Sequence, residues 1–271
     1  MPSPRQTLKN LGLAPTRRRG QNFLRDQEIA KRLAAATVAF GEGPILEIGP
    51  GLGALTRPLL DLGAKVTAVE LDRGLAAALD KWPEVQEGRL KVINEDVLKL
   101  NLRDLGAAPY VVVGNLPYNL SSPILFWFLR QGESLKAGVF ALQKEMAQSL
   151  LAKPGEERYG RLSVALSLWA KVSPILEIPP SAFQPKPKVQ SAAVALVPQK
   201  GPNLALKSLE TFTAKVFRAR RKTLANNLIA AYGPLKTQSL LAAFNLDPLI
   251  RAEKLEPSLL AQMAKLLEEG A

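Results

Sequence analysis

The segment Glu47-Ile48-Gly49-Pro50-Gly51-Leu52-Gly53-Ala54-Leu55-Thr56 follows a short apolar run at 44–48 and opens a stretch with leucines at helical spacing. A glycine loop between a strand and a helix lets the backbone turn tightly and approach a ligand, because glycine has no Cβ atom. The loop also satisfies the loose dinucleotide-binding pattern, and Glu70 lies 19 residues after Gly51, where an acid that binds a ribose is expected. The segment therefore predicts a nucleotide-like ligand, and a nicotinamide-dependent dehydrogenase is one interpretation at this point.

Around this loop, runs rich in β-branched residues alternate with segments of helical periodicity. The runs lie at 44–48, 65–69, 90–93, 110–113 and 138–142. Such alternation predicts an α/β fold with a parallel sheet covered by helices on both faces. Two later runs, 172–178 and 191–197, flank a proline-rich loop and are expected to form an antiparallel addition at the sheet edge.

The pattern changes near residue 200. Amphipathic helices are predicted over 206–232, 237–244 and 257–267, with breaks at Gly233-Pro234 and Asp247-Pro248. We therefore expect a basic N-terminal arm over 1–25, a ligand-binding catalytic domain over 26–200 and a small all-α domain over 201–271.

The composition excludes several kinds of chemistry. The 271 residues include 36 Lys+Arg and 24 Asp+Glu, a net charge of +12, with no Cys and no His. Without Cys the chain has no disulfides, no thiolate nucleophile and no cysteine zinc site. Without His it lacks the usual general base and the commonest metal ligand, so we expect no metal. Catalysis has to use carboxylates, amides, hydroxyls, aromatic rings or a cofactor.

The positive charge lies at the two ends of the chain. Residues 1–25 hold six basic residues and no acid, and residues 201–271 hold ten basic and six acidic residues. This distribution favours a polyanionic partner, nucleic acid first, although the first dozen residues alone are equally typical of a solvated arm. Neither a membrane span nor the apolar core of a signal peptide is evident, so we expect a cytoplasmic protein with no membrane partner.

Three acids lie at the carboxyl ends of three neighbouring predicted strands: Glu47 is on the first strand, and Glu70 and Asp96 follow the next two. Carboxylates at the carboxyl edge of a sheet suit a ligand with an ammonium group, a ribose diol and an adenine amine, and they repel a pyrophosphate. S-adenosylmethionine has these three groups. Taken singly, Glu47 and Asp96 are also typical of ordinary polar strand ends.

The segment Gly114-Asn115-Leu116-Pro117-Tyr118-Asn119 ends the fourth predicted strand. It suits methylation of an exocyclic amine, whose lone pair is conjugated with the ring. The Asn115 side-chain oxygen and the Leu116 carbonyl can accept the two hydrogens of the amine and aim its lone pair at the methyl group. Pro117 fixes the turn and Tyr118 can stack on the base. A sulfonium donor supplies the driving force, so no His or Cys is needed.

Five motifs occur in order across nearly the whole chain: Gly20-Gln21-Asn22-Phe23-Leu24, Glu47 to Gly53, Asn115 to Asn119, Gln143-Lys144-Glu145 and Pro180-Ser181-Ala182-Phe183-Gln184-Pro185-Lys186-Pro187-Lys188-Val189. Together they resemble the KsgA family of small-subunit (16S) rRNA adenine N6,N6-dimethyltransferases.

The resemblance implies a Rossmann-like seven-stranded S-adenosylmethionine-dependent methyltransferase sheet and dimethylation of two adjacent adenosines in a 3′-terminal hairpin during small-subunit maturation. It implies cofactor contacts at Asn22, Leu24, Gly49, Glu70, Leu71, Asp96, Val97 and Asn115, to which the loop and the row of acids add Glu47 and Gly51. The family often has His where this chain has Asn22, and both side chains can form hydrogen bonds.

Phe183 lies in the proline-rich loop. A buried structural ring is one interpretation. Because enzymes that modify nucleobases take the base out of its stack, and because the resemblance puts this ring at the pocket, we expect Phe183 to clamp the extruded base against Tyr118.

Two clusters of cations are candidates for RNA binding: Arg17, Arg18 and Arg19 near the start, and Arg218, Arg220, Arg221 and Lys222 on the predicted helix 206–232. Helix-borne cations can follow a phosphate backbone, and a solvated helix face is the alternative.

We expect a monomer that binds small-subunit rRNA within an immature subunit. A large-subunit methylase of the macrolide-resistance type and a non-catalytic RNA-binding assembly factor remain alternatives. The dehydrogenase drops out because the chain offers no acid or base for hydride transfer.

Overall fold

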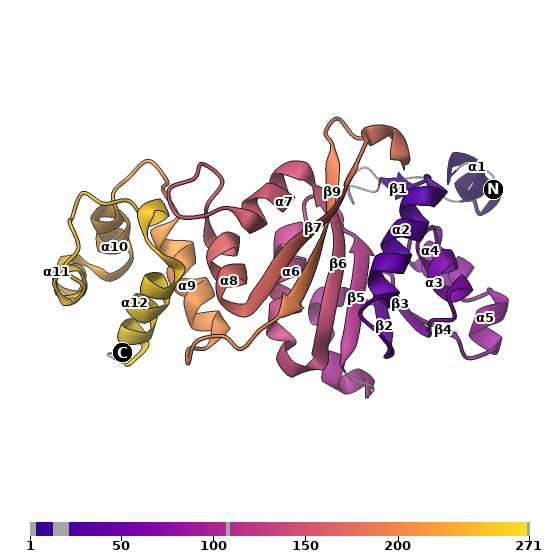
Figure 1. Ribbon diagram of the computed structural model, residues 1–271, viewed down its shortest axis with the longest axis horizontal. Helices are drawn as coiled ribbons and strands as arrows, with labels where there is room; N and C mark the ends of the chain where they lie inside the picture. The colour runs from indigo at the N-terminus through magenta and orange to yellow at the C-terminus, as the bar shows by residue number, and fades with distance from the viewer. Residues whose placement is uncertain (1–3, 13–21, 107–108, 270–271) are drawn as a thin grey trace. The chain divides into compact units, whose positions relative to one another are not determined.

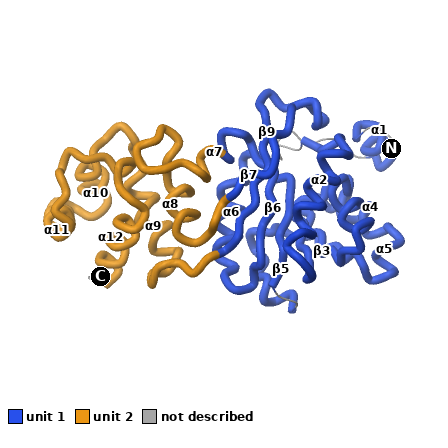
Figure 2. Tube along the Cα trace, viewed as in Figure 1, with its two compact units in different colours: residues 1–147, 173–198 blue, residues 148–172, 199–271 orange. Residues whose placement is uncertain are grey.

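The computed structural model describes residues 4–12, 22–106 and 109–269. The chain divides into two compact units (Figure 2), the first formed by residues 1–147 and 173–198 and the second by 148–172 and 199–271. The structure thus groups residues 148–172 with the C-terminal helices, whereas the sequence pattern suggests a single boundary near 200. The reason is that helix α8 (Arg161–Trp169) packs against α9 and α12 of the second unit.

A seven-stranded sheet forms the centre of the first unit (Figure 1), and its order is β4-β3-β2-β5-β6-β9-β7. The strands are β2 (Ile45–Ile48), β3 (Val66–Val69), β4 (Leu90–Ile93), β5 (Tyr110–Asn115), β6 (Leu135–Gln143), β7 (Ala170–Ile178) and β9 (Ser191–Pro198). The pairs from β4 to β6 are parallel, and β9 is antiparallel to β6. The α/β fold class, the five parallel strands and the antiparallel addition at the edge are confirmed.

The central strands β2 and β5 are buried because helices cover the sheet there. All four residues of β2 are buried, as are the first five of β5. Helix α2 packs against β5 and β6, α3 against β3, α4 against β4 and α6 against β6. The helices of this unit are α1 (Pro4–Asn10), α2 (Gln27–Val38), α3 (Thr56–Asp61), α4 (Arg73–Leu79), α5 (Pro83–Gln86) and α6 (Ser121–Arg130), and α7 (Lys144–Leu151) crosses into the second unit.

The register aligns the carboxyl ends of the central strands. Ile48 of β2 lies opposite both Val69 of β3 and Gly114 of β5, and Val69 lies opposite Ile93 of β4. Residues that follow these positions therefore meet at one edge. A second, two-stranded sheet joins β1 (Phe23–Leu24) to β8 (Phe183–Gln184).

The second unit is helical, with α8 followed by α9 (Leu206–Val216), α10 (Leu224–Tyr232), α11 (Pro234–Ala243) and α12 (Pro257–Glu269). The continuous helix expected over 206–232 is wrong, because the chain leaves the helix at 217–223. Like charges at 218, 220, 221 and 222 disfavour a helix there. The Thr223 hydroxyl accepts from Asn226 N and so begins a new helix.

No helix in the described part of the chain is both long and apolar enough to cross a membrane.

Candidate active site

A cavity of about 310 Å³ opens at the carboxyl edge of the sheet, beside the ends of β2 and β5. The strand order reverses between these two strands, and ligands of open α/β sheets bind at such a point. The cavity volume is within the range of small-molecule sites. Thirteen of the candidate residues line it: Asn22, Leu24, Glu47, Gly49, Gly51, Glu70, Leu71, Asp96, Val97, Asn115, Leu116, Pro117 and Tyr118.

Glu70 organises the glycine loop. Its Oε2 accepts a hydrogen bond from Gly51 N at 3.1 Å, and its Oε1 accepts one from Asp72 N at 2.8 Å. Gly51 has φ +58°, a backbone conformation that glycine adopts without strain. The Glu70 carboxylate, just after β3, is thus held against the glycine loop that follows β2, and together they form one wall of the cavity.

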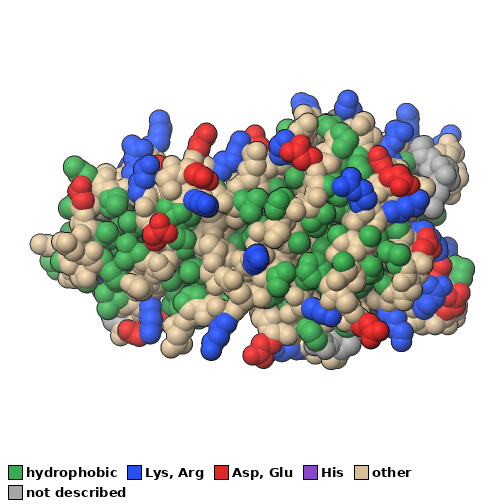
Figure 3. Space-filling view, viewed as in Figure 1, with side chains coloured by type: hydrophobic (Ala, Val, Ile, Leu, Met, Phe, Trp, Pro, Cys, Tyr) green, Lys and Arg blue, Asp and Glu red, His purple; other side chains and the backbone are tan. Residues whose placement is uncertain are grey.

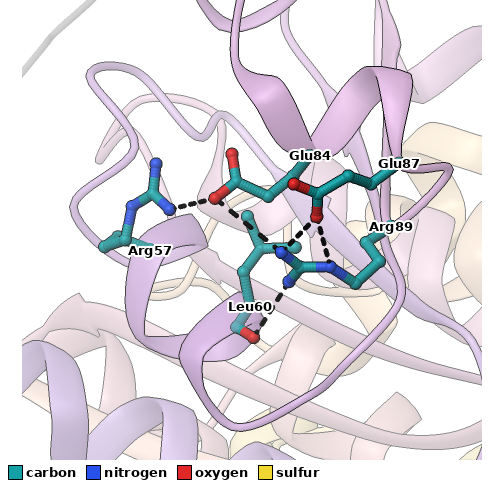
Figure 4. A network of polar contacts seen from close by, with 5 residues as sticks. All are labelled: Arg57, Leu60, Glu84, Glu87 and Arg89. Carbon is teal, nitrogen blue, oxygen red and sulfur yellow. Dashed lines mark hydrogen bonds and ion pairs between the residues drawn. The ribbon is translucent and has the colours of Figure 1, made fainter.

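Trp82 supports the same loop without lining the cavity. A Cβ atom at Gly53 would lie 2.3 Å from the Trp82 ring, so only glycine fits there. The guanidinium of Arg57 lies 4.2 Å from the centre of that ring and forms an ion pair with Glu84. Figure 4 shows Arg89 joining this network through Glu84, Glu87 and the Leu60 carbonyl. No sequence pattern indicates this support, because its partners are brought together by packing between α3 and α5.

Glu47 is a buried acid at the cavity. The residue is 2% exposed, and its Oε2 has no hydrogen-bond partner among the described residues. Burial raises the pKa of Glu47 to about 8, an effect that the nearby Thr56 opposes and the Glu70 charge increases. An orphaned carboxylate oxygen at a cavity is a strong indication of a ligand that donates to it.

Asp96 and its neighbours form the far wall. Asp96 caps the short 3₁₀ helix η2 (Val97–Lys99) by accepting from Leu98 N at 3.0 Å, which fixes the side chain at the end of β4. Val97 is buried, whereas Leu71 is exposed at the edge of the cavity. Two apolar side chains beside a carboxylate suit a flat aromatic ring that carries an amine.

The carboxamide of Asn115 has a defined orientation. Its Nδ2 donates to the Asn22 carbonyl oxygen at 2.9 Å, and since a carbonyl can only accept, the side-chain oxygen of Asn115 is the atom that can accept from a ligand. A Cβ atom at Gly114 would lie 2.8 Å from the Ile48 carbonyl, so glycine is required next to Asn115. The backbone of Leu116 is held by donation from its N–H to the Ala141 carbonyl at 3.0 Å.

Phe183 does not lie where the sequence interpretation puts it. The ring is 2% exposed, belongs to the core cluster that contains Leu24 and Ala182, and is not part of the cavity lining. In this structure Phe183 therefore occupies the position of a buried structural ring, and the clamp against Tyr118 stays a prediction. The pairing of β8 with β1 turns Phe183 towards the core, and the apolar ring is stabilised by burial there.

The C-terminal cations lie in the second unit, in a turn between α9 and α10 rather than on a helix. We call Arg218, Arg220, Arg221 and Lys222 the basic turn, and all four are exposed. Asn227 braces it by donating to the Ala219 carbonyl and accepting from Ala219 N, both at 3.2 Å. Figure 3 shows Lys and Arg side chains gathered along the upper edge of this unit. Arg17, Arg18 and Arg19 lie outside the described residues.

Two further arginines join the basic turn in an open hollow that the sequence does not indicate. Arg158 and Arg251 line this hollow together with Arg220 and Arg221. Arg220 pairs with Glu253 at 3.6 Å and donates to the Glu157 carbonyl. These residues lie far apart in the sequence, so no local pattern can group them.

The strand order with one antiparallel strand, and the cavity at the carboxyl edge, define the Rossmann-like fold of S-adenosylmethionine-dependent methyltransferases. The chain belongs to the ribosomal RNA adenine dimethylase family, whose sequence model matches residues 15–269. It is 41% identical over 259 residues to the ribosomal RNA small subunit methyltransferase A of Photorhabdus laumondii. The aligned region covers 93% of each of the two chains.

Two solved structures are similar to it. A dimethyladenosine transferase from Plasmodium falciparum matches with a TM-score of 0.72 and 24% identity over 92% of this chain and 98% of the other, which supports the fold. The 23S rRNA methyltransferase ErmE matches with a TM-score of 0.62 and 26% identity over 91% of this chain and 100% of the other. The resemblance drawn from the five motifs is confirmed.

Proposed function

We propose that this protein transfers methyl groups from S-adenosyl-L-methionine to the N6 amines of two adjacent adenosines in a 3′-terminal hairpin of small-subunit (16S) rRNA. The names of its relatives support the substrate class. The observation that carries the chemistry is the fixed carboxamide of Asn115, whose oxygen is the atom available to an amine.

The cavity fits the cofactor because acidic groups lie where its donors would need them. The orphaned oxygen of Glu47 suits the ammonium group, Glu70 suits the ribose diol, and Asp96 with Leu71 and Val97 suits the adenine. Asn22, Leu24, Gly49 and Gly51 complete the contacts. When bound, S-adenosylmethionine supplies an activated methyl group on a sulfonium.

The target amine needs positioning rather than a strong base. The side-chain oxygen of Asn115 and the Leu116 carbonyl accept the two N6 hydrogens, which turns the nitrogen lone pair away from the ring. Pro117 fixes this turn, and Tyr118 stacks on the base that has left its helix. In this way a chain without His or Cys performs the transfer.

The basic turn with Arg158 and Arg251, together with Arg17, Arg18 and Arg19, would bind the phosphate backbone of the rRNA. We further propose that the protein acts as a monomer on an immature small subunit in the cytoplasm.

The decisive experiment offers immature small subunits and, separately, large-subunit rRNA with a labelled methyl donor, followed by mass spectrometry of the nucleosides. We expect dimethyladenosine in the small-subunit rRNA alone. Asn115→Ala should lower the rate about 100-fold or more, a larger loss than any accompanying fall in cofactor affinity, because the carboxamide oxygen is proposed to position the amine. Asn203→Ala, at an exposed loop of the second unit, is the matched control and should match the wild type.

Two outcomes would overturn this assignment. Modification of large-subunit rRNA alone would favour the second candidate, a methylase of the macrolide-resistance type, for which the similarity to ErmE is the supporting observation. Absence of any dimethyladenosine would favour a non-catalytic assembly factor, against which the intact Asn115 to Tyr118 segment argues.

A further inference from the structure

The proline-rich segment lies between two parts of the proposed active site. At its start, β8 pairs with β1, with Phe183 opposite Leu24 and Gln184 opposite Phe23. At its end, β9 begins at Ser191, which lies opposite Gln143 of β6. The segment is therefore attached to the cofactor side of the cavity through β1 and to the central sheet through β9.

Ser191 contacts the residue proposed to stack on the target base. Its Oγ lies 2.8 Å from the hydroxyl oxygen of Tyr118, and the two groups share a hydrogen bond. Ser191 is 1% exposed, so water cannot readily replace this bond. Burial raises the pKa of Tyr118, with the Ser191 contact opposing, so the phenol stays protonated at neutral pH.

The bond fixes the ring at its far end. Tyr118 follows directly on Pro117, whose ring restricts the backbone at the base of the side chain. The hydroxyl contact with Ser191 then restricts rotation of the Tyr118 ring at its other end. The next positions of β9 are Ala192 and Ala193, which shows that alanine side chains fit this strand. Packing alone does not call for a hydroxyl at 191, whereas the Tyr118 phenol does.

We propose that Ser191 is a positioning residue that holds the Tyr118 ring in the orientation that receives the target base, and this rests on the proposed function. The proline-rich segment then acts as a brace for both ends of the Asn115 to Tyr118 turn. Ser191 holds Tyr118, and β8 holds β1 next to Asn22, whose carbonyl orients Asn115. This role is separate from the base clamp expected of Phe183, which stays a prediction.

The test is a double-mutant cycle of Ser191→Ala and Tyr118→Phe on the full-length protein. Each single variant should lower kcat on small-subunit rRNA about 5- to 20-fold, the loss expected for one buried hydrogen bond. The double variant should lose no more than either single one, because both remove the same bond. The calorimetric affinity of Ser191→Ala for S-adenosylmethionine should stay within about twofold of wild type, since Ser191 does not line the cavity. Ser167→Ala, which removes a hydroxyl that bonds Val164 within α8, is the matched control.

A second readout does not depend on activity. The chain has four tyrosines, and 3-fluorotyrosine labelling gives each a ¹⁹F resonance, with that of Tyr118 assigned from Tyr118→Phe. Ser191→Ala should shift and broaden the Tyr118 signal and leave the other three in place.

Failure of this inference differs from failure of the proposed function. A wild-type protein that makes no dimethyladenosine refutes the function, and the ¹⁹F spectrum then decides the role of Ser191 alone. Wild-type kcat in Ser191→Ala, additive losses in the double variant, or an unmoved Tyr118 resonance would each overturn the positioning role.

Discussion

At the scale of single residues, Glu47 is a carboxyl group that burial keeps protonated at neutral pH. An isolated carboxylate is costly in a buried position, so burial raises the pKa of Glu47 to about 8 and the group keeps its proton below that pH. A cationic group entering the cavity would stabilise the carboxylate and release that proton. Burial of Glu47 therefore lowers the stability of the folded protein and favours the binding of a cationic ligand.

We expect the free energy of unfolding to reveal this residue. The pKa of Glu47 is raised in the folded state, so the unfolded chain binds fewer protons between pH 5 and 8 and wild-type stability falls over that window as pH rises. Glu47→Gln should remove this fall and be more stable than wild type at pH 8.5, with no difference at pH 4.5. Urea unfolding across this pH range measures the effect.

Glu42→Gln provides the control, because Glu42 is exposed in the loop before β2. The same charge is removed there without burial, so the pH dependence should be that of wild type. Parallel pH profiles for wild type and Glu47→Gln would contradict the assignment of a buried, protonated Glu47.

At the scale of elements, α3 and α5 hold the glycine loop through a polar network (Figure 4). Arg57 of α3 bonds to Glu84 of α5 and holds the pKa of that carboxyl below its usual range, while its guanidinium covers Trp82. The Glu84 side chain is only 9% exposed, so its charge depends on Arg57.

Glu84→Gln should lower the free energy of unfolding by about 1 to 3 kcal/mol at pH 7, because Arg57 loses a charged partner. A depressed carboxyl pKa contributes stability above the unfolded pKa and loses it as pH falls. The difference from wild type should therefore shrink below about pH 4. Glu87→Gln removes a half-exposed partner of Arg89 and should cost less than about 0.5 kcal/mol. Equal costs for the two variants, measured by urea unfolding, would contradict the network.

The basic turn offers a second prediction at this scale. Asn227 holds the turn through Ala219 without carrying charge, so Asn227→Ala should loosen it and weaken rRNA binding about three- to tenfold. The slope of affinity against salt should stay unchanged, because every cation is retained. Asn226→Ala, an exposed neighbour on α10, is the control for a filter-binding titration. Wild-type affinity in Asn227→Ala would show that the turn needs no brace.

At the scale of the whole molecule, charge is divided between the two units. The second unit carries 15 Lys and Arg against 8 Asp and Glu, whereas the carboxylates of the cofactor cavity lie in the first. The proposed cofactor contacts therefore lie in the first unit, and the proposed rRNA contacts of the basic turn lie in the second.

Reversal of two cations should separate these functions. Arg220→Glu with Arg221→Glu should weaken rRNA binding and reduce the salt slope by about 2, because each arginine is expected to neutralise one phosphate. Cofactor affinity should not change. Lys207→Glu with Lys236→Glu makes the same charge change on exposed sites of α9 and α11 and should leave the slope closer to wild type. An unchanged slope in the Arg220 and Arg221 variant would rule out phosphate binding there.

Much of the site is predictable because its residues follow strands. Glu47, Glu70, Asp96 and Asn115 each come at or just after a predicted strand, and parallel strands bring such positions to one edge. The cationic segment is less predictable, because periodicity alone does not weigh the repulsion of like charges or the cap at Thr223.

Local periodicity and composition predict most of the strands and helices along the chain and the concentration of charge at its ends. The glycine loop and the row of acids predict part of the cavity lining, and the family resemblance adds Asn22, Leu24, Leu71 and Val97. Three features emerge only once the chain is folded: Phe183 lies in the core, Ser191 holds Tyr118, and Trp82 with Arg57 supports the glycine loop. These contacts join residues far apart in the chain, and their partners are selected by packing and burial, which no local pattern records.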